Sequence, residues 1–186
     1  PALCNRIDRN TGGIVIAAKN AEALRILNEK IRDREIEKFY LCAVSGRPRP
    51  ASGRLENYLF KDAKKNQVFI KDKPEPGCKT AVTEYRVLGR KGQLSLVECR
   101  LLTGRTHQIR AQMAHAGWPL LGDGKYGRER FNKDFGENGQ ALYSYRLRFE
   151  FPTDAGVLEY LRGKEFQVER VDFAEKYFGV TELNFE

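Results

Sequence analysis

The 186-residue chain has few of the residues that build metal centres, disulfide frameworks or membrane spans. Its four cysteines are scattered without a CxxC pair, which indicates neither a zinc site nor a set of disulfides. Two histidines are too few for a metal site that needs several of them. No apolar run approaches the roughly 20 residues that cross a bilayer, and no basic-then-apolar leader is present. We therefore expect a cytoplasmic protein with free thiols, no bound metal and no membrane partner.

The composition is that of a globular protein, with 41% hydrophobic and 31% charged residues. The length suits one domain with a core of its own. Lys and Arg number 33 against 25 Asp and Glu, a net charge of +8. Residues 163–186 hold three basic and six acidic side chains, a net charge of −3, which leaves +11 on residues 1–162. This basic body points to a polyanionic partner, although a well-solvated surface alone would also carry such an excess.

Alternating apolar and polar residues predict more strands than helices. Strands are expected at residues 14–18, 38–45, 80–88, 93–101 and 141–151, with a basic hairpin region at 51–79. Several of these strands follow one another through hairpins rather than helical crossovers. The sequence therefore predicts an α+β domain around a largely antiparallel, mixed β-sheet with flanking helices.

Helix signals are fewer. Asn20 can cap a helix that follows it. A second helix is expected over residues 106–116, with Thr106 as its cap and Gly117 at its end. A short helix is expected near residues 174–178 in the acidic segment.

Residues 5–13 form the first segment that combines charge with a sharp turn. Asp8 lies between Arg6 and Arg9, and guanidinium groups favour the ionised form of a carboxylate. Loops that lead into strands often carry catalytic groups. An ordinary Asx turn with surface arginines would give the same local pattern.

Two further segments carry candidate site residues. Tyr40 lies within an expected strand, where a tyrosine is most often part of the core. In residues 101–110 a strand ends, a glycine turn follows and a helix opens, with Arg105 just before the helix. His107 and Arg110 are three residues apart and share a helix face, at the end where N–H groups attract phosphate. The alternatives are a structural His107 and a buried ion pair for Arg110.

In this order and spacing, the segments resemble the RluA-type family of pseudouridine synthases. The family motif His-Arg-Leu-Asp-x-x-Thr-Ser-Gly corresponds to residues 5–13, and Lys-x-Tyr-x-Ala-x-Val-x-Gly to residues 38–46, with one residue of register slack around residues 41–43. Its motif Gly-Arg-Thr-His-Gln-Ile-Arg is complete at residues 104–110. Its motif Pro-Leu-x-Gly-Asp-x-x-Tyr-Gly matches residues 119–127. Residues 140–149 resemble its closing segment, Gln-Ala-Leu-His-Ala-x-x-Leu-x-Phe.

The resemblance implies an enzyme, an isomerase that detaches a uracil from its ribose, turns it and rejoins it through C5. The substrate would be structured RNA, either ribosomal or transfer RNA, and no cofactor or metal would be needed. The fold would be that of a pseudouridine synthase catalytic domain over residues 1–186. We expect it to be N-terminally incomplete, with a core over about residues 1–162 and an acidic segment at 163–186.

Site residues are carried over from the matching positions. Asp8 would be the catalytic carboxylate, Tyr40 would contact the target base and accept a proton, and Arg110 would form a salt bridge with Asp8. Arg6 would insert into the RNA where the target nucleotide is flipped out. The RNA-binding residues would be Arg6, Arg9, Arg105, Thr106, His107 and Gln108.

Four positions depart from the family pattern: Asn5, Gly12, Gln112 and Tyr143. They bear on substrate preference and leave the three catalytic positions intact. A second interpretation is a non-catalytic protein that keeps the fold to bind or remodel RNA. A DNA-binding module is disfavoured, since no recognition helix with base-reading residues is present. A monomer is the default expectation.

Overall fold

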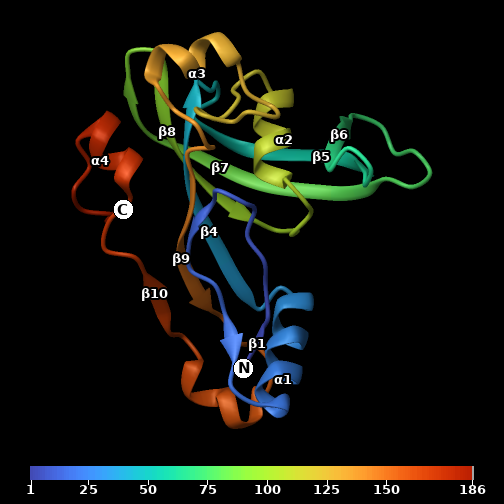
Figure 1. Ribbon diagram of the computed structural model, residues 1–186. Coiled ribbons are helices and arrows are strands. Elements are labelled where there is room, and N and C mark those ends of the chain that lie inside the picture. Colours follow the sequence, from blue (N-terminus) through green and yellow to red (C-terminus); the bar gives the residue numbers. More distant parts are fainter. Residues whose placement is uncertain (186) are drawn as a thin grey trace.

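An eight-stranded sheet forms the centre of the fold (Figure 1). The structure, a computed structural model, describes residues 1–185. The strands of this sheet are β2 (Gly12–Gly13), β4 (Ile36–Ser45), β5 (Ser52–Asp62), β6 (Gln67–Lys71), β7 (Lys79–Lys91), β8 (Leu94–Leu101), β9 (Leu142–Phe149) and β10 (Glu165–Gln167). Their order is β10-β9-β4-β8-β7-β5-β6, all antiparallel, and β2 adds to β9 in parallel. The predicted α+β class with a largely antiparallel sheet is confirmed.

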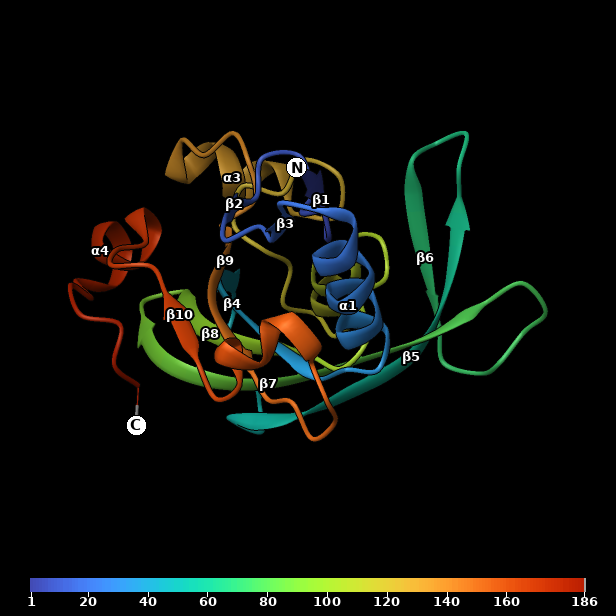
Figure 2. The same cartoon turned by 90° about the horizontal axis from the view of Figure 1, so that it is seen from below.

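Helices and a small second sheet surround this centre. They are β1 (Ala2–Leu3) paired with β3 (Ala17–Ala18), α1 (Ala21–Arg32), α2 (Gln108–His115), α3 (Glu129–Phe135), the 3-10 helix η1 (Gly156–Leu161) and α4 (Asp172–Phe178). In Figure 2 the β5–β6 hairpin and α4 lie at opposite ends of the molecule. Within residues 1–185 no helix is both long and apolar enough to cross a membrane.

Two helix ends follow their local sequence. Asn20 caps α1, because its Oδ1 accepts a hydrogen bond from the Ala23 amide at 2.8 Å. Gly117 follows the C-cap of α2, Ala116, and its φ of 93° is in the left-handed region that glycine adopts freely. The Trp118 amide then donates back to the Met113 carbonyl at 2.9 Å, which closes the helix in a Schellman motif. Both ends were predicted.

The central strands are buried on both faces. The cluster on the α2 face includes Tyr40, Cys42, Val44, Ile109 and Met113. The cluster on the opposite face includes Phe39, Leu41, Leu96, Val171, Ala174 and Leu183. Because successive side chains of β4 point to opposite faces, its apolar run needs cover on both. The acidic C-terminal segment supplies one of these covers, so the core extends beyond the boundary near residue 162 that charge had suggested.

Some predicted elements differ from the observed ones. Residues 14–18 were expected to form a buried strand, but only Ala17 and Ala18 pair, and Val15 is exposed. An apolar run alone does not distinguish a buried strand from a connection that rests half-buried on a helix. Thr106 does not cap α2, which begins at Gln108 instead. The short helices α3 and η1 were not predicted.

Gln112 joins α2 to the sheet. It is 1% exposed, and its Oε1 accepts a hydrogen bond from the Thr83 hydroxyl at 2.7 Å. Its Nε2 donates to the carbonyls of Leu55 at 3.2 Å and Ala81 at 3.0 Å. One amide therefore bonds to groups on both β5 and β7.

We expect Gln112→Ala to lower the free energy of unfolding by about 1–3 kcal/mol, because the buried Thr83 hydroxyl loses the acceptor of its hydrogen bond. Urea denaturation measures the change. Gln93→Ala provides the matched control, because that side chain is exposed and should leave the stability within about 0.5 kcal/mol. Equal effects of the two variants would contradict a joining role for Gln112.

Candidate active site

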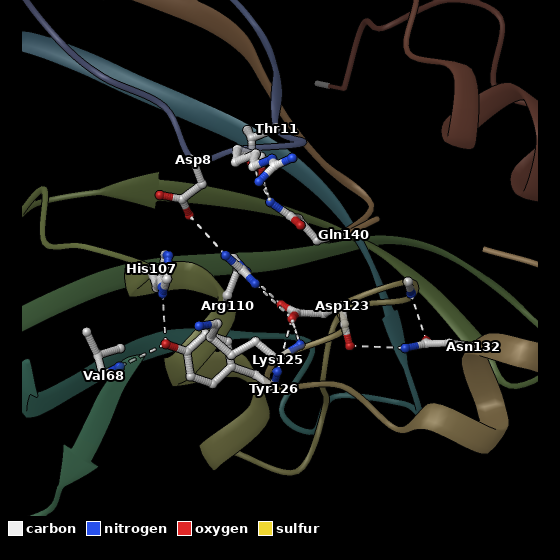
Figure 3. Close-up of polar contacts among 12 residues, drawn as sticks. Asp8, Thr11, Val68, His107, Arg110, Asp123, Lys125, Tyr126, Asn132 and Gln140 are labelled. Atoms are coloured by element: carbon white, nitrogen blue, oxygen red, sulfur yellow. Dashed lines mark hydrogen bonds and ion pairs between the residues drawn. The ribbon is translucent and has the colours of Figure 1, made fainter. Parts of the chain in front are cut away.

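The loop that carries Asp8 is a tight turn held from behind by Gln140. The Asp8 carbonyl accepts a hydrogen bond from the Thr11 amide at 3.0 Å, and Asn10 adopts a φ of 68°, which asparagine tolerates. Gln140 Nε2 donates to the Arg9 carbonyl at 2.6 Å and to the Thr11 hydroxyl at 3.1 Å (Figure 3). The Asp8 side chain is 25% exposed. The backbone is thus fixed while the carboxylate stays accessible.

After the turn the chain lies directly against β9. Gly13 has a φ of 114°, and a Cβ there would lie 2.1 Å from the Ser144 carbonyl oxygen. A Cβ on Gly12 would lie 2.5 Å from the Tyr143 ring. Two of the departures from the family pattern, Gly12 and Tyr143, are therefore in contact, and the bulkier ring occupies the space that a side chain at residue 12 would need.

The other two departures also have structural partners. Asn5 Oδ1 accepts a hydrogen bond from the Ile16 amide at 2.8 Å, which closes the base of the Asp8 loop. Gln112 lies in the interior below α2, as described above. None of the four positions removes a group from the surroundings of Asp8.

Arg110 lies between two carboxylates. Its Nη1 is 3.9 Å from Asp8 Oδ2, so the ion pair implied by the resemblance is present. Its shorter bonds go to Asp123: Nε to Oδ2 at 2.7 Å and Nη2 to Oδ1 at 3.0 Å (Figure 3). The Asp123 side chain is 0% exposed. Arg110 is therefore anchored by one buried carboxylate and presents its remaining nitrogen to the other.

Asp123 is itself held by its own loop. Its Oδ1 accepts hydrogen bonds from the amides of Lys125 at 2.9 Å and Tyr126 at 3.0 Å, and Asn132 Nδ2 donates to its carbonyl at 3.1 Å. Burial raises the pKa of Asp123, but the hydrogen bonds from Arg110 and from these amides outweigh it and hold the pKa below its ordinary value. Asp123 stood in a matching motif, yet nothing in its local sequence indicated that its partner would be Arg110.

Tyr40 is part of the core and also faces the site. Burial raises its pKa to about 12; a hydrogen bond with Ser144 lowers it, and the charge of Asp8 raises it. The phenol is consequently neutral at pH 7 in the RNA-free protein. The core position expected for Tyr40 is confirmed, and its role toward a target base stays a prediction.

Lys38 is a residue near the site that was named only as part of a motif. A Cβ on Gly104 would lie 3.2 Å from Lys38 Nζ, so the ammonium group lies beside the start of the residue 104–110 segment. Burial lowers the pKa of this lysine. Its position two residues before Tyr40 in β4 was the signal in the sequence.

Four of the six expected RNA-binding residues are exposed or half-buried, and the other two are buried. Arg6 and Arg9 are exposed on either side of Asp8, and Thr106 is half-buried. Arg105 is also half-buried, and its Nε donates to the Thr80 carbonyl at 3.0 Å. These four side chains lie where RNA could reach them.

The structure corrects the prediction that Gln108 binds RNA. It is 3% exposed, and its Oε1 accepts hydrogen bonds from the Thr103 hydroxyl at 2.7 Å and the Arg105 amide at 3.0 Å. Its Nε2 donates to the Val82 carbonyl at 3.0 Å and the Thr83 hydroxyl at 2.8 Å. With every hydrogen-bonding position of the amide occupied, Gln108 braces the loop from inside and leaves no atom for RNA.

His107 is buried and has a left-handed backbone with a φ of 52°. Its Nδ1 is 2.8 Å from the Tyr126 hydroxyl. The other histidine, His115, is paired with Asp72 at 2.9 Å at the far end of α2. Within residues 1–185 no three His, Cys, Asp or Glu side chains gather as metal ligands do.

The sequence matches a known family. Residues 1–115 match the model of the family described as RNA pseudouridylate synthase. The chain belongs to this family. It is 32% identical over 185 residues to ribosomal large subunit pseudouridine synthase D of Borreliella burgdorferi, covering 99% of this chain and 54% of that protein. It is 37% identical over 160 residues to an uncharacterized RNA pseudouridine synthase of Bacillus subtilis, covering 86% and 51%.

Solved structures agree on the fold. Human RNA Pseudouridylate Synthase Domain Containing 4 superposes with a TM-score of 0.71 at 22% identity, covering 91% of this chain and 71% of that one. Human RNA Pseudouridylate Synthase Domain Containing 1 gives 0.70 at 21% identity, covering 98% and 82%. The chain spans about half the length of the curated relatives it matches.

We expect Asp123→Asn to lower the free energy of unfolding by about 3–5 kcal/mol at pH 7, since it leaves the buried Arg110 charge uncompensated. The folded-state pKa of Asp123 is depressed, so its contribution is present above the ordinary carboxyl pKa and is lost as pH falls through the folded value. The difference between the two proteins should therefore shrink below about pH 4.

Urea denaturation across pH measures both effects. Asp72→Asn is the matched control, because that carboxylate is 72% exposed and pairs only at the surface. A pH-independent difference for Asp123→Asn would contradict an ionic anchor.

Proposed function

We propose that the protein is an RNA pseudouridine synthase that isomerises uridine in structured RNA, with Asp8 as the catalytic carboxylate. The observation that carries this proposal is that Arg110 forms ion pairs with both Asp8 and Asp123. A buried guanidinium is fixed by a bidentate bond to Asp123 and faces an accessible carboxylate with its free nitrogen. Membership of the RNA pseudouridylate synthase family supports the reaction class.

The proposed reaction breaks the bond between ribose C1′ and uracil N1 and forms a bond from C1′ to C5. The C5 proton leaves, and N1 gains one, so no redox equivalent is consumed. Arg110 orients Asp8, as a carboxylate acting on the ribose requires. Tyr40 is neutral at pH 7, and the charge of Asp8 raises the pKa of its hydroxyl, which supports a place for Tyr40 beside the target base. To accept the C5 proton, Tyr40 would first have to lose its own phenolic proton. We therefore assign Tyr40, in its neutral form, contact with the target base.

We propose ribosomal RNA of the large subunit as the substrate class. Two kinds of observation support it: the names of several relatives refer to the ribosomal large subunit, and the body of the chain is basic. Arg6 and Arg9, exposed beside Asp8, are suited to the phosphates around an extruded nucleotide. Extrusion of a base from structured RNA costs a few kcal/mol, which contacts in the site must offset.

We expect Asp8→Asn to abolish pseudouridine formation, because it keeps the shape of the side chain and removes its charge. Release of tritium from RNA labelled at uridine C5 measures turnover, and RNA affinity should change by less than about threefold, about 0.7 kcal/mol. Asp134→Asn, an exposed carboxylate on α3, is the matched control and should retain full activity. Undiminished turnover by Asp8→Asn would refute its catalytic role.

The cellular counterpart is a map of pseudouridine across total RNA with and without the gene. Loss of one or a few sites in large-subunit RNA is the expected outcome. If the purified protein binds RNA but every pseudouridine persists in cells without the gene, the protein would instead be a non-catalytic RNA-binding protein.

Phosphate contacts should make RNA binding steeply salt-dependent, because each contact releases counterions. We expect Arg6→Gln and Arg9→Gln each to reduce the slope of log affinity against log salt by about 1. Arg25→Gln on α1, an exposed arginine paired with Glu29, is the control and should leave the slope unchanged. Identical slopes for all three variants would place the RNA elsewhere.

A further inference from the structure

The hydroxyl of Tyr126 connects the sheet edge to His107. It accepts a hydrogen bond from the Val68 amide at 2.9 Å and lies 2.8 Å from His107 Nδ1 (Figure 3). The Val68 amide occupies one lone pair, and among residues 1–185 His107 Nδ1 is the acceptor within hydrogen-bond distance of the phenolic proton, so we assign that proton to the bond with Nδ1. His107 Nδ1 is therefore an acceptor, and the ring proton resides on Nε2.

The local backbone and Tyr126 together fix this ring. His107 has a φ of 52°, unfavourable for a residue with a Cβ and retained only where the surroundings require it. The Tyr126 ring meets the imidazole edge-on, with centroids 5.6 Å apart. Arg110 in turn lies over the Tyr126 ring at 5.2 Å. The same tyrosine thus contacts both the histidine and the arginine that faces Asp8.

Its surroundings keep the imidazole uncharged. Burial lowers the pKa of His107 most; Asp8 and Asp123 raise it, whereas Arg110 and Lys125 lower it. In Figure 3 the imidazole lies on the Asp8 side of Tyr126, with its second nitrogen directed away from the phenol. A neutral N–H donor, buried beneath the catalytic carboxylate, differs in kind from the exposed arginines that suit phosphate.

We propose that His107 is a further catalytic residue that donates its Nε2–H to a carbonyl oxygen of the uracil as the base leaves the ribose, and that Tyr126 is the positioning residue that fixes this tautomer. When the C1′–N1 bond breaks, its electron pair stays with the uracil and spreads over N1 and the two carbonyl oxygens. A donor aimed at one of them stabilises that charge and keeps its own proton. This inference rests on the proposed function.

The tautomer can be tested without turnover. The chain has two histidines, so His115→Gln leaves one imidazole for ¹⁵N spectroscopy. We expect an unprotonated Nδ1 and a protonated Nε2 at pH 7, and a mixture of tautomers after Tyr126→Phe. A protonated Nδ1 in the parent, or a spectrum unmoved by Tyr126→Phe, overturns the positioning role whatever the activity.

Kinetics test the donor itself. His107→Asn tolerates the left-handed backbone and can still reach Tyr126, but it lacks a group at the Nε2 position. We expect kcat to fall about 100-fold, the effect of losing one such donor, while RNA affinity stays within about threefold. Tyr126→Phe should lower kcat by a smaller factor, and Tyr160→Phe, whose ring is 68% exposed, should not.

The competing outcome is equally definite. Weaker RNA binding with unchanged kcat in His107→Asn would make this residue a phosphate contact and overturn the inference. Inactive wild-type protein would refute the proposed function, and the inferred role in the reaction with it, while the spectroscopic result would still decide how Tyr126 positions His107. Thermal unfolding of each variant verifies that the fold is kept.

Discussion

The buried bond between Arg110 and Asp123 is the interaction on which the site depends. A guanidinium taken out of water needs a partner of opposite charge with matched geometry, and the bidentate carboxylate provides it. Once that requirement is met inside the protein, the remaining nitrogen is free to face Asp8. Asp8 can then be held by a weaker, longer contact and keep its carboxylate accessible.

The loops around this pair are braced through side-chain amides. Gln140 holds the Asp8 turn, Gln108 holds the turn before α2, Gln112 joins that helix to the sheet, and Asn132 holds the loop of Asp123. An amide carries both donors and an acceptor, so one side chain can satisfy the unpaired backbone groups of an irregular loop. The rigid geometry of the site thus depends on neutral side-chain amides, while the charged side chains of Asp8, Arg110 and Asp123 pair with one another.

Local signals identified what depends on neighbours in the chain. The cap at Asn20, the strand that contains Tyr40 and the hairpin of β7 and β8 follow from periodicity and turn chemistry, and all were predicted. Residues 14–18 were not, because the same apolar run suits a strand and a half-buried connection. The family motif identified Asp8, Tyr40 and Arg110 as a group but could not distinguish Gln108, an interior brace, from its neighbours at the surface.

By itself the sequence determined the fold class, the segments that bear charge and the candidate residues Asp8, Tyr40 and Arg110. Only the tertiary structure decided their partners: Arg110 bonds chiefly to Asp123, Tyr126 contacts His107, and Gln140 reaches Arg9 from 131 positions away. The physical reason is that hydrogen bonds and ion pairs depend on distance and direction in space. Spacing along the chain fixes these within a helix or a hairpin, but across a sheet they are set by which strands pair.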